Sequence, residues 1–349
     1  MGCRKRKAST DAESTRKRQR TSQPQPSEDF ANVTETSTAV TGNGDGPRKR
    51  QRVSFKKDAT SSSVKAATSK EKRQKTNVAS TSRQEFAAKY EQLNLLGEGG
   101  HGSVYAGYRR ADHFPVAIKY IPRDNIICKS VSQNKKTLPL EVAVMRKMAK
   151  GRSVGKSAAI SLLDYYDLEQ ELILVLERPV PSVDLLRYIQ VKGGSLQEAE
   201  ARLIMKQLVE AATELQSKNI FHRDIKLENI LIETSSDVPR LRLIDFGLSC
   251  FTKKTSLYRT FYGTSAHIPP EWYQCWTYRA GPTTVWQLGV VLYEILHGTS
   301  FETTMFLNNR LTINEQLSQS CQDVLRLCLA ADPQQRPSLE QLQLHPWLI

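Results

Sequence analysis

The strongest constraint on the fold of this chain is the order of two hydrophobic patterns along its sequence. Short runs rich in Val, Tyr and Ile come first, and Gly or polar turns separate them. These runs span 90–97, 103–110, 114–121, 159–166 and 171–177. Such runs predict antiparallel β-strands, whereas the pattern becomes mostly helical after Pro181. We therefore expect an α+β fold with a β-rich first lobe, a helical second lobe and a ligand site between them.

Helical periodicity is clearest after Ser195. Glu198 follows three residues later, as in a capping box, and apolar residues then recur at steps of three and four. They are Ile204, Leu208, Ala212 and Leu215. This spacing predicts an amphipathic helix that turns one apolar stripe toward a core. Further helices are expected at 138–150, 284–296, 318–330 and 338–344.

Charge divides the chain near residue 85. Residues 1–85 carry 20 of the 50 Lys and Arg residues but only 9 of the 36 Asp and Glu residues, so they hold +11 of the net charge of +14. They are rich in Ser, Thr and Gln, and such a segment cannot offset its chain entropy. We expect a disordered basic tail at 1–85 and a folded domain at 86–349. No membrane span is expected, because no apolar run approaches about 20 residues.

Three basic clusters lie in the tail, at 4–7, 16–20 and 47–52. They are typical of nuclear import signals that an import receptor binds, or of loose contact with nucleic acid. A solvated tail without a dedicated partner is the alternative. The import interpretation places the protein in the nucleus as well as in the cytoplasm. We expect the protein to be a monomer.

The first expected strand ends in a glycine-rich stretch. Gly97, Gly99 and Gly102 fit the pattern GxGxxGxV together with Val104. Glycines allow a tight turn and bring backbone N–H groups close to phosphate oxygens. The dinucleotide-binding fold uses the same glycine spacing but requires a helix next, whereas a strand follows here. The pattern therefore favours phosphate binding in a β-hairpin and argues against NAD.

Lys119 lies in the third expected strand, directly after the apolar residues Val116, Ala117 and Ile118. A lysine that is buried among apolar strand residues needs an anionic partner, and Glu141 in the following helix is a candidate. The alternative is a lysine whose ammonium group reaches solvent. The tetrapeptide alone does not decide between the two.

The stretch FHRDIKLENILI at 221–232 mixes charged and apolar side chains in a way that suits neither a surface loop nor a buried strand. Asp224 and Asn229 are five residues apart with Lys226 between them, and Asp245 ends an aliphatic strand further on. Phosphoryl transfer needs a carboxylate that accepts the hydroxyl's proton, positive charge near the γ-phosphate, and oxygen ligands for Mg²⁺. Asp224 would supply the first and Lys226 the second. Asn229 and Asp245 would supply the third.

Taken in this order, the motifs resemble the signature of protein kinases over residues 90–347. The resemblance implies the bilobal protein kinase fold, with a β-rich lobe at 86–178 and a helical lobe at 179–349. It also implies catalysis with ATP and Mg²⁺ on protein substrates. Lys226 and Thr264 are similar to the residues of serine/threonine kinases at these places, rather than to those of tyrosine kinases.

Two residues far apart in the chain extend the resemblance. Glu271 stands in PPEW, where the family has Ala-Pro-Glu, and Arg336 in DPQQRPS is similar to the arginine that pairs with that glutamate. The resemblance implies a buried ion pair between them in the helical lobe.

Within the kinases the chain resembles the Pim family in LERPVP at 176–181, in PPEW and in VWQLGVVLYEILHG, which Thr284 precedes where most kinases have an aspartate. One adenine-binding position of the hinge falls on Pro179, which has no N–H, so ATP is expected to keep only its bond to the Glu177 carbonyl. The implied catalytic residues are Asp224, Lys226, Lys119 and Glu141. The implied ATP contacts are Leu96, Gly97, Gly99, Gly102, Val104, Ala117, Lys119, Glu177 and Asp184.

Pim kinases resemble one another in preferring arginine before the target serine or threonine, and they bind that arginine with carboxylates. Asp184 and Glu228 keep this charge, but Arg187 and Leu227 stand where the family has aspartates. In the activation segment, the family's aspartates are replaced by Arg259 or Thr260 and by Tyr262. We expect a serine/threonine kinase with a weakened preference for basic sites, in which Glu228 and Thr264 contact the substrate.

Arg223 precedes Asp224, at a place where kinases often receive a phosphate from the activation segment. Pim kinases are similar in layout and are active without that phosphate, and we expect the same here. The alternative function is a pseudokinase or scaffold with a basic tail that contacts nucleic acid. Loss of Lys119, Asp224 or Asp245 would indicate it, and none of the three is lost. The folded part carries little excess positive charge, which argues against a nucleic-acid-binding fold.

Overall fold

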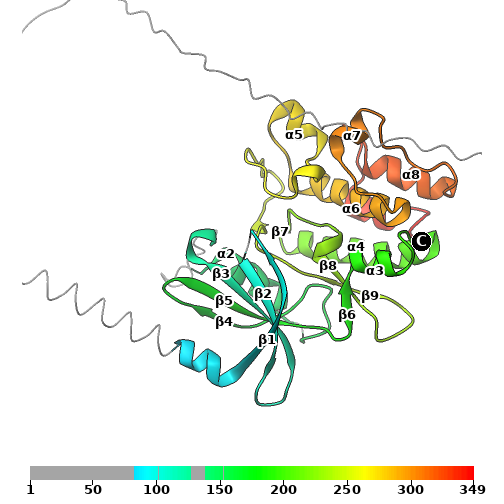
Figure 1. Ribbon diagram of the computed structural model, residues 1–349. Coiled ribbons are helices and arrows are strands. Elements are labelled where there is room, and N and C mark those ends of the chain that lie inside the picture. Colours follow the sequence, from blue (N-terminus) through cyan, green and yellow to red (C-terminus); the bar gives the residue numbers. More distant parts are fainter. Residues whose placement is uncertain (1–81, 101, 127–137, 152) are drawn as a thin grey trace, which may run out of the picture. The chain divides into compact units, whose positions relative to one another are not determined.

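A five-stranded antiparallel sheet forms the first lobe (Figure 1). Its strands are β1 Tyr90–Gly99, β2 Gly102–Arg109, β3 Pro115–Pro122, β4 Leu162–Asp167 and β5 Glu171–Glu177. They lie in the order β1-β2-β3-β5-β4, and every neighbouring pair is antiparallel. Each of the five predicted runs therefore forms a strand, and the first three form the expected meander.

The computed structural model describes residues 82–100, 102–126, 138–151 and 153–349. Most of the predicted tail, including its three basic clusters, lies outside the described residues. Residues 82–89 form a helix, so the predicted border between tail and domain falls inside a helix. Phe86 of this helix packs in an apolar cluster on the sheet, and Arg83 forms an ion pair with Glu171. The folded part therefore includes residues that we had assigned to the tail.

Strand β5 is buried because both faces of the sheet are covered. Its side chains alternate between two apolar clusters, as the two-residue period of a strand requires. Ile173 and Val175 pack in one cluster with Phe86. Leu174 belongs to the other cluster, which continues into helix α2 Leu140–Ala149 and the second lobe. The uninterrupted apolar run of β5 is the sequence pattern of a strand buried on two sides.

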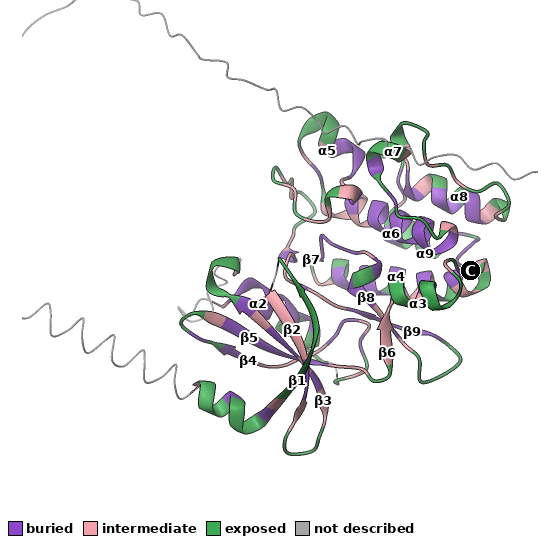
Figure 2. Cartoon of the chain, in the orientation of Figure 1, coloured by how far each residue is buried: buried purple, intermediate pink, exposed green. Residues whose placement is uncertain are grey.

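The second lobe is mostly helical. Its helices are α3 Leu185–Val191, α4 Glu198–Ser217, α5 Pro270–Cys275, α6 Ala280–His297, α7 Thr303–Leu307, α8 Gln319–Cys328 and α9 Leu339–Gln343. Helix α6 is buried along most of its length and contacts both α4 and α8 (Figure 2). The predicted helices correspond to α2, α4, α6, α8 and α9. In the described ranges, none of the helices combines the length and the apolar content that a membrane span requires.

The predicted capping box at the start of α4 is wrong. The helix begins at Glu198, and its N-cap residue Gln197 makes no side-chain capping bond within the described chain. The Glu198 carboxylate instead accepts from the N–H and the hydroxyl of Ser318, at 2.6 and 2.7 Å, and from the indole N–H of Trp347 at 3.0 Å. The predicted apolar stripe is confirmed. Its members Ile204, Leu208, Ala212 and Leu215 are all buried.

Short strands hold the loops that carry the charged motifs. They are β6 Ser182–Asp184, β7 Ile220–Phe221, β8 Ile230–Glu233, β9 Arg240–Leu243 and β10 Cys250–Phe251, with 3₁₀ turns at Arg123–Asn125, Leu227–Asn229 and Ser265–His267. Strands β6, β8 and β9 form one sheet, and β7 pairs with β10. Because β8 begins directly after Asn229 and β9 ends two residues before Asp245, this sheet positions both predicted metal ligands.

Candidate active site

Lys119 is buried in β3 and holds two carboxylates together. Its side chain is 6% exposed, and its Nζ atom lies 2.9 Å from Oε1 of Glu141 and 2.8 Å from Oδ1 of Asp245. Burial alone would lower the pKa of Lys119, but the charges of the two carboxylates outweigh burial and raise it. The lysine therefore has the anionic partner that we expected, and the alternative of an ammonium group in solvent is wrong.

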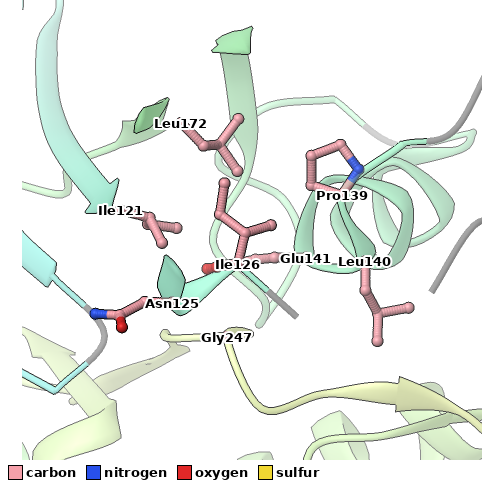
Figure 3. A pocket seen from close by; sticks show the side chains of 8 residues that line it. All are labelled: Ile121, Asn125, Ile126, Pro139, Leu140, Glu141, Leu172 and Gly247. Carbon is pink, nitrogen blue, oxygen red and sulfur yellow. The ribbon is translucent and has the colours of Figure 1, made fainter. Parts of the chain in front are cut away.

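Apolar packing fixes the start of the helix that carries Glu141. Leu140 from α2, Ile121 from β3 and Leu172 from β5 line a cavity beside it, and Gly247 of the segment after β9 lies at its edge (Figure 3). The cavity volume is about 20 Å³, which suffices for one water molecule. It is therefore not a nucleotide site, but it shows that the sheet, α2 and the segment after β9 meet around Glu141.

The carboxylate of Asp224 has partners from two segments of the chain. Its Oδ1 atom accepts from the N–H of Thr264 at 3.0 Å and from the Thr264 hydroxyl at 2.7 Å. Its Oδ2 atom accepts from the side-chain amide of Asn229 at 3.1 Å and lies 3.5 Å from Nζ of Lys226. These contacts fix the orientation of the carboxylate. The structure thus brings together four residues that the sequence motifs singled out.

Asn229 and Asp245 lie on neighbouring segments because the N–H of Ile244 donates to the Asn229 carbonyl at 2.9 Å. The two bonds from the Asn229 side chain to Asp224 both use the amide nitrogen, so the amide oxygen can serve as a metal ligand. Asp245 has a φ of 58°, in the left-handed region. One carboxylate and one amide oxygen fit a hard cation that also binds phosphates and water. The described residues contain no cluster of three or more His, Cys, Asp or Glu side chains that could hold a metal.

The glycines between β1 and β2 differ in what they do for the fold. Gly102 has a φ of 116°, and a Cβ atom there would lie 1.9 Å from the Tyr120 carbonyl oxygen. A Cβ atom at Gly97 or Gly99 would have no described atom within 4 Å. The fold therefore disfavours any side chain at Gly102, whereas the other two glycines leave open space beside the backbone. Such space lets a phosphate approach backbone N–H groups.

The predicted apolar ATP contacts come from the same sheet. Gly97 pairs with Val104 across β1 and β2, and Ala117 follows on β3. Leu96 is 50% exposed, and Val104 and Ala117 are half-buried. Partly exposed apolar side chains on one sheet can cover the face of an adenine ring.

Glu177 is the last residue of β5. It directly precedes residues 178–181, which connect the two lobes and which we call the hinge. Its carboxylate accepts from Arg242 at 2.7 Å and from the N–H of Ser161 at 3.2 Å. The side chain is thus bound inside the protein, and the backbone carbonyl is the part that could meet adenine. Asp184 has a structural role that we had not predicted, because its Oδ1 atom accepts from the N–H of Arg187 at 2.7 Å and caps α3.

The residues predicted to bind the substrate differ in exposure. Glu228, Arg187 and Arg259 are exposed. Leu227, however, is only 6% exposed and belongs to the main apolar core. The interpretation of Leu227 as a missing surface carboxylate is therefore wrong, because this position belongs to the apolar core, where a carboxylate is costly.

Arg336 and Glu271 form the predicted buried ion pair. The two terminal nitrogens of Arg336 lie 3.0 and 2.6 Å from the two carboxylate oxygens of Glu271. Arg336 also donates to the carbonyls of Ala330 and Pro282, at 2.9 and 3.1 Å, and its guanidinium lies 5.0 Å from the ring centre of Trp286. This pair connects α5 to the segment between α8 and α9.

Arg223, the predicted phosphate receiver, is buried among aromatic rings. Its guanidinium carbon lies 4.8 Å from the ring centres of Tyr258 and Tyr262 and 5.9 Å from that of Phe221. It also donates to the carbonyl of Leu248 at 3.3 Å. We call the three rings the aromatic cage of Arg223. Cation–π contacts of this kind attach the activation segment, which carries both tyrosines, to the catalytic loop.

Two buried residues near the site were missed in the sequence. Gln287 of α6 donates to the Arg223 carbonyl at 2.5 Å. The helix in which Thr284 replaces the usual aspartate therefore still has a side chain that bonds to the catalytic loop. Arg242 is the partner of Glu177. The sequence could have indicated this role, because Arg242 lies within the aliphatic stretch LRLI and, like Lys119, needs an anionic partner if it is buried.

Comparison with known proteins gives one consistent result. The model of the protein kinase domain matches residues 90–348. The chain belongs to the protein kinase family. Members of this family use ATP and a divalent metal ion to phosphorylate proteins. The kinase has the β-rich first lobe and helical second lobe that the resemblance implied.

Two relatives that are named serine/threonine-protein kinases match most of the chain. The kinase is 39% identical to "Serine/threonine-protein kinase pim-2" of Danio rerio over 277 residues, which are 78% of this chain and 88% of the relative. It is 34% identical to "Serine/threonine-protein kinase prk-2" of Caenorhabditis elegans over 270 residues, or 75% of this chain and 59% of the relative. The kinase is therefore a Pim-like serine/threonine kinase, and the pseudokinase alternative is not favoured.

Proposed function

We propose that the kinase transfers the γ-phosphate of ATP to serine and threonine hydroxyls, with Asp224 accepting the hydroxyl's proton. The observation that carries the proposal is the set of bonds on the Asp224 carboxylate, to which Thr264 and Asn229 both donate. A carboxylate that is already oriented needs no rearrangement when the hydroxyl arrives. Lys226, 3.5 Å away, would bring positive charge to the transferred phosphate.

Lys119 is the proposed anchor of the ATP phosphates. Its bond to Asp245 joins the two lobes, and phosphate oxygens can replace that carboxylate while Glu141 keeps the ammonium in place. We assign Mg²⁺ to Asn229 and Asp245, because an amide and a carboxylate oxygen suit a cation that prefers oxygen ligands. When bound, the cation would neutralise charge on the phosphates. The chain itself supplies the orientation of both ligands.

The test is phosphorylation of a mixture of serine and threonine peptides by purified protein with Mg²⁺ and ATP. We expect turnover by the wild type and its loss in Asp224→Asn, which keeps the size of the side chain. ATP binding without turnover in the wild type would favour the scaffold alternative.

We also propose that the preference for arginine upstream of the target residue is weaker than in Pim kinases. Glu228 is exposed and can attract such an arginine, but Asp184 is engaged in capping α3. Arg187 and Arg259 are exposed and would repel it. Each semi-exposed charge pair is worth about 0.2–1 kcal/mol, so several together can change kcat/KM by about tenfold.

An oriented peptide library tests this preference. Arg187→Asp should strengthen selection for upstream arginine, whereas Arg326→Asp on α8, an equal change of charge on an exposed helix position, should leave it unaltered. Selection by the wild type as strong as that of a Pim kinase assayed in parallel would refute the proposal. Leu227 is not a suitable position for such a test, because it is buried.

The aromatic cage supports activity without phosphorylation of the activation segment. Arg223 contacts Tyr258 and Tyr262 of that segment directly, so the segment has a partner where other kinases use a phosphate. We expect phosphatase-treated enzyme to retain most of its activity. A decrease to less than about a tenth would mean that a phosphate is required.

The basic clusters of the tail are proposed to bind an import receptor, so that the kinase is present in both nucleus and cytoplasm. Deletion of residues 1–81 preserves the Arg83–Glu171 ion pair and should leave activity intact while reducing the nuclear fraction. An unchanged distribution in cells would remove the import interpretation. The monomeric state is tested by light scattering of the full chain.

A further inference from the structure

One buried arginine bonds to two carboxylates beside the hinge. Arg242 lies in β9 and is 1% exposed. One terminal nitrogen lies 2.7 Å from Oε2 of Glu177, and the other lies 2.8 Å from Oε1 of Glu233. The side chains of the two glutamates are only 6% and 15% exposed. The planar guanidinium can reach both partners at once because its donors point in fixed, separate directions.

The two glutamates stand at opposite ends of the hinge. Glu177 is the last residue of β5, directly before residues 178–181. Glu233 lies in β8 opposite Ser182, which is the first residue of β6 directly after the hinge. A single side chain of β9 therefore attaches both ends of the hinge to the same sheet.

The charges in this bridge depend on one another. Burial alone would raise the pKa of Glu177, but hydrogen bonding and the charge of Arg242 outweigh burial and lower it. Leu241 and Leu243, the neighbours of Arg242 in β9, are each 1% exposed, so the surroundings are apolar. Removing one partner of a buried ion pair leaves the other charge without compensation and forces local rearrangement. Rearrangement here would move the ends of the hinge.

We propose that Arg242 is a positioning residue for ATP binding. By bonding to Glu177 and Glu233 it fixes the hinge, and with it the Glu177 carbonyl that would accept from adenine. The inference rests on the proposed function, in which the Glu177 carbonyl accepts from adenine. Because Pro179 has no N–H, the hinge cannot offer adenine a second bond at that position if the carbonyl is displaced. The effect of Arg242 should therefore appear in ATP affinity more than in the chemical step.

Variants of two arginines on the same strand test the proposal. Arg242→Lys keeps the charge but cannot bridge two carboxylates with a planar fork. We expect it to raise the KM for ATP by about tenfold with kcat changed less than about twofold, and Arg242→Met to have a larger effect. The matched control is Arg240→Met. Arg240 also lies in β9, and it contacts Glu233 and the carbonyl of Gly155.

Calorimetric binding of Mg²⁺-ATP to the same variants separates this inference from the proposed function. If the wild type does not phosphorylate peptides, the proposed function fails, whereas the dissociation constant for ATP still measures the effect of Arg242. A merely structural arginine would lower the melting temperature and leave ATP affinity unchanged at the assay temperature.

Unchanged ATP affinity in a folded Arg242→Lys protein, or an equal loss in Arg240→Met, would overturn the proposal. If neither Arg242 variant folds, Glu233→Gln provides the measurement, because it keeps the Arg242–Glu177 bond. Glu233 also pairs with Arg240, so the result is compared with that of Arg240→Met. We expect about a two- to threefold rise in the KM for ATP from this milder change, and no rise would equally refute the role.

Discussion

Lys119 in the first lobe and Arg336 in the second are both buried cations that meet a buried glutamate. Arg336 fills its donors with Glu271 and with backbone carbonyls of the same lobe. Lys119 has Glu141 as a buried partner, but its other carboxylate is Asp245, whose side chain is 30% exposed and comes from the other lobe. A ligand can compete for Asp245 and its lysine, whereas nothing that enters from solvent can replace the partners of Arg336.

The difference separates a pair that serves chemistry from one that serves folding. Both pairs have short distances and low exposure, so geometry within the pair does not tell them apart. What distinguishes the two is whether the cation's further partners can be reached from solvent, as Asp245 can. Activity and stability should therefore respond separately when residues of the two kinds are changed.

The largest effect is expected from the three residues proposed to anchor phosphate, accept the hydroxyl's proton and bind the metal ion. Lys119→Met, Asp224→Asn and Asp245→Asn should each lower kcat/KM by about 10³–10⁵-fold, because positioning and charge supply most of the catalysis in phosphoryl transfer. The chain should remain folded, as circular dichroism and a melting curve would show. If Lys119→Met unfolds the chain as readily as loss of Arg336 does, the comparison fails.

The second prediction concerns the pair that serves folding. Glu271→Gln should lower the free energy of unfolding by about 3–5 kcal/mol, because it leaves the charge of Arg336 buried without a carboxylate. Activity per folded molecule should stay within about twofold. The control is the double variant Glu271→Leu with Arg336→Met, which buries no charge and should recover much of the stability in urea unfolding. A double variant no more stable than the single one would contradict this account.

Gly102 and Gly99, in one hairpin, also separate a role in folding from a role in ATP binding. Gly102→Ala should lower the free energy of unfolding by about 1–3 kcal/mol, because its backbone is in a region that side chains disfavour and its Cβ atom would overlap a carbonyl oxygen. Gly99→Ala should change stability by less than about 0.5 kcal/mol and should raise the KM for ATP. The two measurements are urea unfolding and initial rates at varied ATP. Equal effects on stability would show that Gly99 also serves the fold.

The smallest effect is expected from a histidine far from the proposed chemistry. His297 accepts from the N–H of Asn314 through Nε2, at 2.9 Å, while Nδ1 donates to the Tyr293 carbonyl at 2.8 Å. Burial lowers its pKa in the folded state. The unfolded state therefore binds a proton first, and stability should fall as pH decreases below about 6.5, by less than about 1.4 kcal/mol per pH unit. His297→Gln should reduce this slope in urea unfolding measured between pH 7 and 5.5. A slope identical to the wild type would exclude His297.

The strands and the order of the motifs could be predicted because local sequence determines them. The uninterrupted apolar run of β5 indicates a strand that is covered on both faces, and Ile173 and Leu174 do belong to different clusters. Asp224, Asn229 and Asp245 were recognisable because phosphoryl transfer needs these residue types. Helices α3, α5 and α7 were missed because five to seven residues are too few to establish a helical period.

Partners that are distant in sequence could not be predicted. Glu198 had the spacing of a capping box, yet it binds Ser318 and Trp347, more than a hundred residues away. Leu227 appeared to be a surface position until the 3₁₀ turn Leu227–Asn229 directed it into the core. In both cases the local pattern was compatible with two outcomes, and packing against remote segments decided between them.

The open space at Gly97 and Gly99 has a consequence for laboratory evolution of this kinase. A library of variants sorted only for soluble, heat-resistant protein would retain glycine at Gly102, where a side chain meets Tyr120. It would accumulate larger residues at the other two positions, because nothing in the described protein opposes them there. Such sorting would enrich stable proteins that no longer phosphorylate their substrates. The sorting step must therefore measure phosphorylated product.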